Sequence, residues 1–442
     1  MALKPSLLAL ALGLSWASAL QAADLVTVYQ HALDYDSELA AARATYQAQE
    51  EVVNEARSGL LPQVGAGASL SRNKRDSDLA GDNTYNSFGY SIELTQPLFR
   101  ADTWYRYQGS KFASRQAAAQ YVLEEQNLIL RTADAYFSVL RAEENLATTK
   151  AAEEAFERQW EQAKQRFDVG LIAITEVLEA QALYDSAKVQ RIAAEGDLAV
   201  ALESLERLTG QSYPNLGKLR EDFPVVHPEP NSPDEWVDTA LQQNLEIQSA
   251  TFAVDVAQQQ LRTNRSLHYP TLDAFASYSD VDISGSSRSA AFNASSQNEF
   301  SIGLQLNVPL YTGGGTQAGV RRARFEVERA EQTLTTVRRN TTLNIRSLMR
   351  TLNTNIESIQ ARKQAIRSAE SALEATRAGY QVGTRNIVEV LDAERLYYET
   401  LRDYANSRFD YVLNSLRLKQ AAGILNPGDL EQLNRWLVET RS

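Results

Sequence analysis

The sequence predicts a mainly α-helical chain with a smaller β part, built by duplication of a half-molecule. Three observations lead to this prediction. The run Phe167-Asp-Val-Gly170, followed by Ile174-Thr-Glu-Val-Leu178, returns as Tyr380-Gln-Val-Gly383, followed by Ile387-Val-Glu-Val-Leu391. Long stretches rich in Ala, Glu, Gln, Arg and Leu contain almost no Pro or Gly, which is typical of long helices. Short segments in each half alternate apolar with small or polar residues, as half-buried strands do.

The duplication covers most of each half. Leu61-Pro62-Gln63 corresponds to Tyr269-Pro270-Thr271, Gln96-Pro97-Leu98-Phe99 to Val308-Pro309-Leu310-Tyr311, and Leu208-Thr209-Gly210 to Ala421-Ala422-Gly423. A period of about 210 residues is too long for a solenoid repeat and indicates a duplicated half-molecule. We therefore expect a first structural repeat over residues 23–210 and a second over 233–423. The proline-rich linker 211–232 and the C-terminal segment 424–442 are expected to form a small belt of extra structure.

Residues 1–22 are expected to be a secretory signal peptide. Lys4 precedes an apolar run over residues 7–16, and small residues follow up to Ala23. This order is typical of exported chains, and the apolar part is too short to span a bilayer. Cleavage is expected after Ala22 or Ala23. The sequence has no cysteine, so disulfides, thiolate metal sites and a cysteine-linked lipid are excluded.

The composition argues against nucleic-acid binding and against catalysis. The formal net charge is −12 and no Lys/Arg cluster is present, so no nucleic-acid partner is expected. The three histidines, His31, His227 and His268, are far apart in sequence and indicate no metal site. No Ser/His/Asp or Cys/His arrangement stands out, so we expect neither an enzyme nor a cofactor. The run 313–315 of three glycines lacks the Lys-Ser/Thr of a phosphate loop and is expected to bend the chain.

The first repeat is predicted to contain three helices and a β-hairpin. A helix over residues 24–58 is indicated by apolar residues at spacings of three, four and seven, and Pro62 ends it. Residues 63–72 and 88–94 alternate as strands, within a hairpin at about 63–99 whose linking stretch 71–87 is polar and turn-rich. A helix over 101–170 would be about 100 Å long. Val169-Gly170 turns the chain into a third helix over 175–208, because Gly tolerates the positive φ of a helix end.

The second repeat is predicted to follow the same plan. A helix over 233–265 precedes a hairpin at about 271–311, with strands over 271–279 and 300–308 and a loop over 280–298 that is rich in Ser, Gly and Asn. A long helix over 317–381, the Val382-Gly383 turn and a last helix over 387–422 complete it. In each repeat the first and third helices together have about the length of the long one, so stacked end to end they could lie beside it.

The strands predict an assembly of several chains. Four strands cannot close a barrel, and open sheet edges are not tolerated in lipid. A cyclic trimer would supply twelve strands, above the minimum of about eight in bacterial outer-membrane barrels. Strands of about ten residues suit an outer membrane. Aromatic residues suited to lipid contact are Phe88, Tyr90, Phe99, Phe300 and Tyr311. The alternative is the edge of a soluble β-sandwich.

Short motifs in both repeats form one co-linear set. They are Asp24-Leu-Val-Thr-Val-Tyr-Gln30, Asn54-Glu-Ala-Arg57, Leu60-Leu-Pro-Gln63, Ala133-Asp-Ala-Tyr-Phe137, Arg166-Phe-Asp-Val-Gly170 and Gly379-Tyr-Gln-Val-Gly-Thr-Arg385. In these motifs the chain resembles the TolC family of outer-membrane efflux and secretion channels over nearly its whole mature length. The resemblance implies a homotrimer in the cell outer membrane. A twelve-stranded β-barrel would be continued by a twelve-helix periplasmic α-barrel, and residues 211–232 and 424–442 would be equatorial segments.

The function implied by the resemblance is that of an exit duct gated at its periplasmic end. It would serve a tripartite efflux pump, a type I protein secretion system, or both. The implied partners are a periplasmic adaptor (membrane fusion) protein, an inner-membrane transporter of RND, ABC or MFS type, and outer-membrane lipid. Cargo and pump stay open. One alternative is a periplasmic coiled-coil adaptor or scaffold, which would need no lipid-facing alternation in residues 88–94 and 300–308. Another is a periplasmic enzyme.

Two carboxylates follow the second helix turn. Glu389 and Asp392 are three residues apart and therefore lie on one helical face. From the pattern alone, a solvated helix face is the more ordinary interpretation. The resemblance implies instead that they form stacked rings at the periplasmic entrance and make it cation-selective. Glu389 stands where the family has an aspartate.

The two helix turns are the expected gate. Tyr380 and Arg385 flank the second turn, where an aromatic and a cation usually serve packing and the helix dipole. The resemblance implies a latch in which they bond Gln159, Thr175 and Glu176 to hold the entrance closed. Glu176 replaces the family's aspartate. The tips of the turns are Val169, Gly170, Val382 and Gly383.

Overall fold

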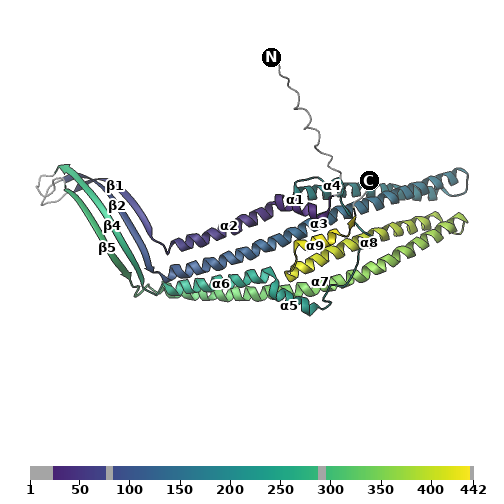
Figure 1. Cartoon of the computed structure of the whole chain (residues 1–442). Coiled ribbons are helices and arrows are strands. Elements are labelled where there is room, and N and C mark those ends of the chain that lie inside the picture. Colours follow the sequence, from purple (N-terminus) through teal and green to yellow (C-terminus); the bar gives the residue numbers. More distant parts are fainter. Residues whose placement is uncertain (1–22, 76–82, 287–294, 439–442) are drawn as a thin grey trace, which may run out of the picture. The chain divides into compact units, whose positions relative to one another are not determined.

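The computed structural model describes residues 23–75, 83–286 and 295–438 (Figure 1). The expected signal peptide lies outside these residues. The chain forms two compact units, the first made of the described residues of Met1–Ala40, Glu124–Asn244 and Thr341–Ser442, and the second of Ala41–Leu123 and Leu245–Asn340. Each unit therefore contains parts of both sequence repeats.

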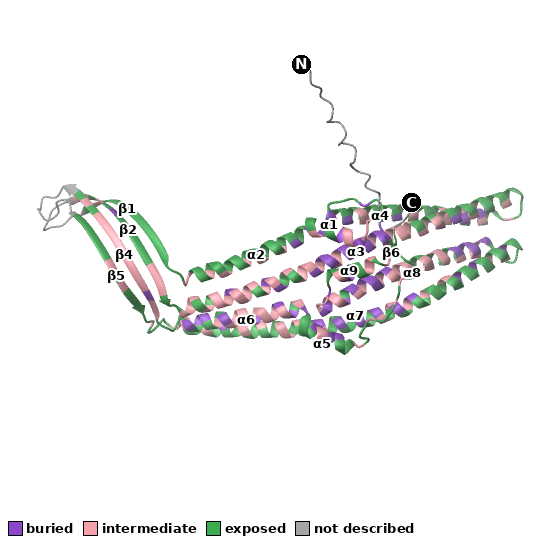
Figure 2. Ribbon diagram, viewed as in Figure 1, coloured by how far each residue is buried: buried purple, intermediate pink, exposed green. Residues whose placement is uncertain are grey.

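The first unit is helical. The structure places here α1 (Leu25–Tyr35), α4 (Ile174–Thr209), α5 (Pro233–Gln243), α8 (Ile387–Ala422) and α9 (Pro427–Asn434), with the C-terminal parts of α3 (Ala101–Asp168) and α7 (Gly315–Gln381). The linker and the C-terminal segment meet in a small antiparallel pair, β3 (Lys218–Leu219) with β6 (Leu437–Val438). Most residues coloured as buried in Figure 2 lie on the helices of this unit, and few lie on the strands.

The second unit holds one antiparallel sheet. Its strands are β1 (Gln63–Arg75), β2 (Asn83–Phe99), β4 (Thr271–Ser286) and β5 (Ser295–Asn307), in the order β1-β2-β4-β5. The unit also contains α6 (Leu245–Ser266), most of α2 (Ser37–Ser58) and the N-terminal parts of α3 and α7. In the described part of the chain, no helix is both long and apolar enough to cross a membrane.

The strands are longer than predicted. The prediction of non-strand structure is wrong over most of the stretch 71–87 and most of the stretch 280–298. The strands β1, β2, β4 and β5 extend into them. The ladder is held by backbone hydrogen bonds, which polar residues make as well as apolar ones. The hydroxyls of Ser71 and Ser87, which face each other across the ladder, are 2.7 Å apart. The apolar alternation therefore marked only part of each strand.

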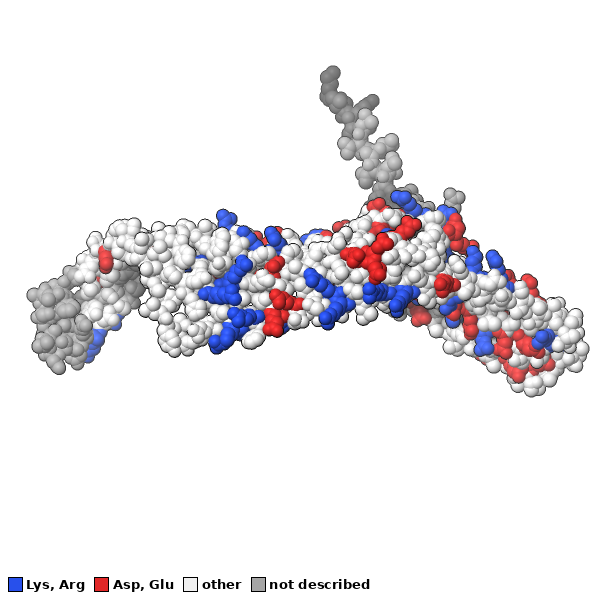
Figure 3. Space-filling model, turned by 90° about the horizontal axis from the view of Figure 1, so that it is seen from below, with Lys and Arg blue, Asp and Glu red and all other residues white. Residues whose placement is uncertain are grey.

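One face of the sheet is mainly apolar and the other mainly polar, as the alternation predicted, although Asp280 and Asp282 lie on the apolar face opposite Tyr90 and Phe88. Large apolar side chains exposed on the first face are Val64, Leu70, Phe88, Tyr90, Ile92, Leu94, Phe300, Ile302, Leu304 and Leu306. The register brings Leu94 opposite Val64, and Ala276 opposite Ile302. Alternate residues such as Glu93, Ser277 and Gln305 belong to the other face. In Figure 3, charged side chains of both signs are interspersed over the helices, and few lie over the strands.

Two predicted helices are each broken after 11 residues. Those expected over 24–58 and 233–265 are interrupted at Asp36 and Asn244, whose backbones are extended. The carboxylate of Asp36 accepts a hydrogen bond from the Leu39 N–H at 2.6 Å, which caps α2. The Asn244 amide donates to the Ala421 carbonyl at 2.9 Å. Neither break was predicted from the sequence, because Asp36 and Asn244 are polar residues that fit the helical period.

The two helix breaks occur at equivalent places in the two repeats, and each packs on an equivalent helix end. Gly210 and Gly423 end α4 and α8 with φ of +69° and +81°. A Cβ on Gly210 would lie 2.7 Å from the Tyr35 ring, and one on Gly423 would lie 2.3 Å from the Gln243 carbonyl oxygen. Each glycine therefore allows a broken helix to pack on a helix end. Helix lengths match too: α1, α2 and α4 have 11, 22 and 36 residues, as do α5, α6 and α8, against 68 in α3 and 67 in α7.

Candidate gate at the helix-hairpin tips

Two hairpins of the first unit, α3/α4 and α7/α8, end in turns of the same geometry. Gly170 and Gly383 have φ of +76° and +80°. The Leu171 N–H donates to the Arg166 carbonyl, and the Thr384 N–H to the Gly379 carbonyl, each at 2.9 Å. These bonds satisfy carbonyls that the helix ends would otherwise leave unpaired. The turns expose Val169 and Val382, whose exposed fractions are 70% and 76%.

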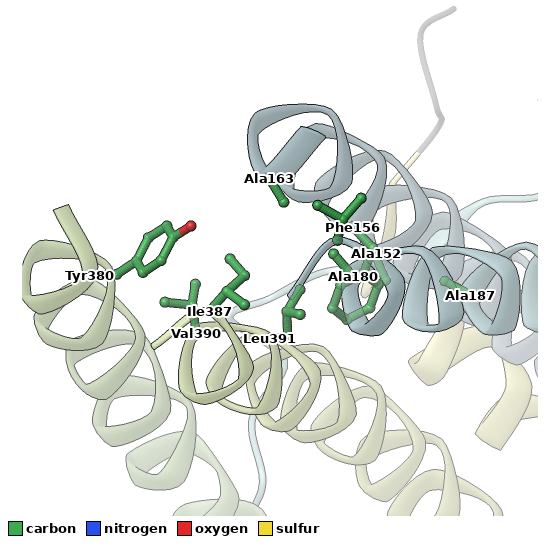
Figure 4. Packing of buried hydrophobic residues seen from close by; sticks show 10 residues of the cluster. Ala152, Phe156, Ala163, Ala180, Ala187, Tyr380, Ile387, Val390 and Leu391 are labelled. Carbon is green, nitrogen blue, oxygen red and sulfur yellow. The ribbon is translucent and has the colours of Figure 1, made fainter. Parts of the chain in front are cut away.

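A buried apolar cluster joins the two hairpins behind these turns. Its members are Ala152, Phe156 and Ala163 of α3, Val177, Ala180 and Ala187 of α4, Tyr380 of α7, and Ile387, Val390 and Leu391 of α8. Figure 4 shows the α8 side chains pointing toward Phe156 and Ala180. Separating the hairpins would expose this surface to water, so the cluster favours their contact.

Tyr380 contacts the other hairpin through its ring. Only 6% of the residue is exposed, and the Arg166 guanidinium lies 4.5 Å from the ring centroid. Such a cation–π contact stabilises by about 0.5–2 kcal/mol. The Tyr380 hydroxyl and the Gln159 Oε1 are buried without a hydrogen-bond partner in the described structure. Within one chain, the Tyr380 ring therefore contacts Arg166. The Tyr380 hydroxyl forms no hydrogen bond with Gln159 in the described structure.

The other expected latch residues lie in the first turns of α4 and α8 or beside them. Thr175 is exposed and Glu176 is half-buried near the start of α4. Arg385 forms an ion pair with Glu389, four residues further along its own chain. A Cβ on Gly379 would lie 2.7 Å from Arg385 Cγ, so glycine at this position lets the arginine stem lie against α7.

Each expected entrance carboxylate has an arginine partner in its own chain. The hydrogen bond from Arg385 lowers the pKa of the Glu389 carboxyl, and the backbone bond from Glu389 N–H to Asn386 Oδ1, 3.0 Å long, caps α8. Asp392 accepts a hydrogen bond from Arg395 at 3.0 Å. The Asp392 side chain is 59% exposed and that of Glu389 is 37% exposed. Both carboxylates are therefore accessible to ions.

Three residues of this region were missed by the sequence analysis. Besides Arg166, they are Glu394 of α8 and Arg377 of α7, which form an ion pair in which the Glu394 side chain is completely buried. Burial raises the pKa of the Glu394 carboxyl, against the opposing effects of Arg377 and Arg158. The signal was present: Glu394 falls in an apolar stripe with Leu391 and Tyr398, at spacings of three and four.

Comparison with known proteins covers nearly the whole chain. Residues 28–211 and 236–424 match the family described as outer membrane efflux protein. Outer membrane protein TolC of Escherichia coli (strain K12) is 39% identical, over 98% of this chain and 89% of that protein. TolC of Vibrio cholerae is 37% identical over 98% of both. The alkaline protease secretion protein AprF of Pseudomonas aeruginosa is 30% identical, over 92% of this chain and 86% of its own length.

Solved structures show the same fold at low identity. The CusC channel superposes with a TM-score of 0.76 at 18% identity, covering 90% of this chain and 92% of CusC. The CmeC outer membrane channel of Campylobacter jejuni gives 0.75, also at 18% identity, over 93% and 89%. These structures confirm the predicted fold class, and the family match together with the TolC relatives confirms the outer-membrane location.

The function predicted from the resemblance is confirmed at the level of an outer-membrane channel for efflux and secretion. The alternative of a periplasmic adaptor has no support, and the matching family is one of channels, not of enzymes. Because the match spans both repeats, the chain belongs to the outer membrane efflux protein family.

Proposed function

We propose that three copies of this chain close into one export duct in the outer membrane. The supporting observation is the open sheet: in the described structure β1 and β5 each have a strand neighbour on one side only, and the apolar face is exposed. Unpaired backbone groups are too costly in lipid for such edges to stay open. Three chains would supply twelve strands, and cyclic symmetry would pair every edge.

The duct would need partners to span the cell envelope. We assign it a periplasmic adaptor protein and an inner-membrane transporter of RND, ABC or MFS type, by analogy with the family. The similarity to a protease secretion protein supports a secreted protein as one cargo, beside small molecules. Positive and negative side chains are interspersed over the helices, and this pattern argues against a nucleic-acid partner.

The hairpin tips would be the gate of this duct. In the proposed closed trimer, Tyr380 and Arg385 bond Gln159, Thr175 or Glu176 on neighbouring helices. The unpaired Tyr380 hydroxyl and Gln159 Oε1 support this latch, because a buried polar atom without a partner costs about 1–3 kcal/mol. A hydrogen bond between latch residues would remove that cost. Glu389 and Asp392 would then form carboxylate rings at the entrance.

The test is the single-channel conductance of the variant Tyr380→Phe plus Arg385→Ser in planar bilayers. Each latch contact contributes about 0.5–1 kcal/mol and is repeated by threefold symmetry. The variant is therefore expected to remain a trimer in detergent and to conduct more than the parent. Tyr397→Phe plus Arg402→Ser, further along α8, is the matched control. A stable trimer with the parent's conductance would refute the latch, and a monomeric species in detergent would refute the duct.

A further inference from the structure

Glu394 is a buried carboxylate at the contact between the two hairpins. Its side chain has an exposed fraction of 0%. It shares a face of α8 with Leu391, a member of the cluster, and with Tyr398, which packs against the cluster. On that face its burial places it between Arg377 of α7, which donates a hydrogen bond to it, and Arg158 of α3, which attracts it from the other hairpin. Separation of the hairpins would return water to this carboxylate.

The groups around Glu394 leave its charge only partly compensated. Arg377 of α7 donates a hydrogen bond to Oε1, whereas Oε2 is buried with no partner in the described structure. Arg158 of α3 attracts the carboxylate from across the hairpin contact, but its ion pair is with Glu154, at 3.8 Å. On α8 itself, burial and then the charge of Glu394 raise the pKa of the Tyr398 hydroxyl.

The fourth helix of the contact brings no opposite charge to Glu394. Tyr184 of α4 stacks on Trp160 and directs its hydroxyl to Glu157, 3.5 Å away. Arg191 of α4 is held by Glu153 and Glu195. A buried carboxylate with a single arginine and one unpaired oxygen is stabilised less by its partners than it would be by water. Packing of the hairpins therefore favours the protonated form of Glu394.

We propose that Glu394 is a proton-linked gating residue: its protonated form keeps the α7/α8 hairpin packed on α3/α4, and its ionised form favours their separation. The proposal rests on the proposed opening of the duct at these tips. Arg377 would limit the effect by holding Oε1, and would keep the charged form tolerable while the gate is closed.

The direction of the pH dependence follows from linkage. Burial raises the pKa of the Glu394 carboxyl above its ordinary value of 4.5 in the packed state, and hydration lowers this pKa when the hairpins part, because Arg377 of the same hairpin stays beside the carboxylate. The contribution to the closed state is therefore full below the pKa of the separated state and is lost as the pH rises through the raised pKa. Acidification is expected to close the tip.

The experiment measures the distance between the two tips of one chain. The sequence has no cysteine, so spin labels on Val169→Cys and Val382→Cys are the only ones introduced. The labelled chain is assembled with excess unlabelled chain in detergent, and distances are measured between about pH 4.5 and about pH 7.5. The parent is expected to gain short distances as the pH falls. In Glu394→Gln this pH dependence is lost and short distances persist. The control Glu399→Gln, at an exposed position of α8, should behave as the parent.

A second pair of variants separates a proton-linked role from a merely structural one. Arg377→Gln leaves the Glu394 charge buried alone, so long distances should increase at neutral pH; adding Glu394→Gln should restore the short ones. Persistence of the parent's pH dependence in a trimeric Glu394→Gln protein would overturn the inference. Tyr380→Phe plus Arg385→Ser is measured in parallel: if it also fails to lengthen the distances, the proposed gate fails, and if it lengthens them, only the role of Glu394 is refuted.

Discussion

At the scale of residues, the proposed entrance is a set of opposite charges in close balance. Glu389 contacts Arg385 of the preceding turn, and Asp392 contacts Arg395 of α8. These pairs are exposed and contribute little stability. The two ion pairs act on the local electrostatic potential, because the positive charge of each arginine offsets the negative charge of one carboxylate. A residue assigned to the latch, Arg385, therefore also weakens the charge that attracts cations.

We predict that Glu389→Ala plus Asp392→Ala weakens the cation preference of the channel. Removing both carboxylates leaves Arg385 and Arg395 unopposed, and the Coulomb attraction for a cation is lost. Reversal potentials in a salt gradient across a planar bilayer measure the change, with Glu399→Ala as control. Unchanged selectivity of the double variant would rule out the entrance assignment.

The pH dependence of selectivity should reveal the Arg385 contact separately. The hydrogen bond from Arg385 lowers the pKa of Glu389 below its ordinary 4.5, so the carboxylate stays ionised at lower pH than a free one. Its contribution to cation preference is present above 4.5 and is lost as the pH falls through the lowered pKa. In Arg385→Ser we expect this loss at higher pH than in the parent. Reversal potentials titrated downward from neutral pH measure it, and coincident titrations would contradict the contact.

Residue spacing alone predicted part of this region. The shared face of Glu389 and Asp392 follows directly from helical geometry. The burial of Glu394 and the Arg166–Tyr380 contact could not be read in the same way, because they depend on which helices pack together. The resemblance implies hydrogen bonds of the Tyr380 hydroxyl, whereas within one chain the Tyr380 ring contacts Arg166.

At the scale of elements, the hairpin turns depend on backbone conformation more than on side-chain contacts. Gly170 and Gly383 have positive φ, and a Cβ at either would meet no atom within 4 Å. The turn motif was recognisable from sequence because glycine is the residue that adopts this conformation freely. The breaks at Asp36 and Asn244 were not, because those residues fit the helical period and are identified as breaks only by what they pack against.

We predict that Gly383→Ala destabilises the α7/α8 turn by about 1–2 kcal/mol, the cost of left-handed backbone for a residue with a Cβ. Gly196→Ala is the matched control, since Gly196 is exposed inside α4 and also has no atom within 4 Å of a Cβ. There alanine should stabilise by up to about 1 kcal/mol. Thermal unfolding of the two purified variants should shift in opposite directions. A neutral Gly383→Ala would mean that the turn relaxes.

At the scale of the whole molecule, the sheet is the part that one chain leaves incomplete. Its mainly apolar face and the two edges that are unpaired in the described chain were anticipated from alternation and strand number, although the strands proved longer. The greater length comes from Ser- and Asn-rich ends that alternation of apolar residues does not mark. Adding a neighbouring β1 beside β5 would keep the sheet antiparallel throughout, since directions alternate along β1-β2-β4-β5.

This pairing predicts a specific covalent trimer. Leu304 of β5 and Val64 of β1 are on the apolar face, at opposite edges of the sheet. Facing residues of antiparallel strands have Cα atoms about 4.5–5.5 Å apart, within the range of a disulfide. Leu304→Cys combined in turn with cysteine at Val64, Ala66 and Ala68 should therefore give at least one variant that oxidises to dimers and trimers on a denaturing gel. Leu304→Cys with Ile92→Cys, on the inner strand β2, should not. If none of the β1 positions cross-links, closure between β5 and β1 of neighbouring chains is wrong.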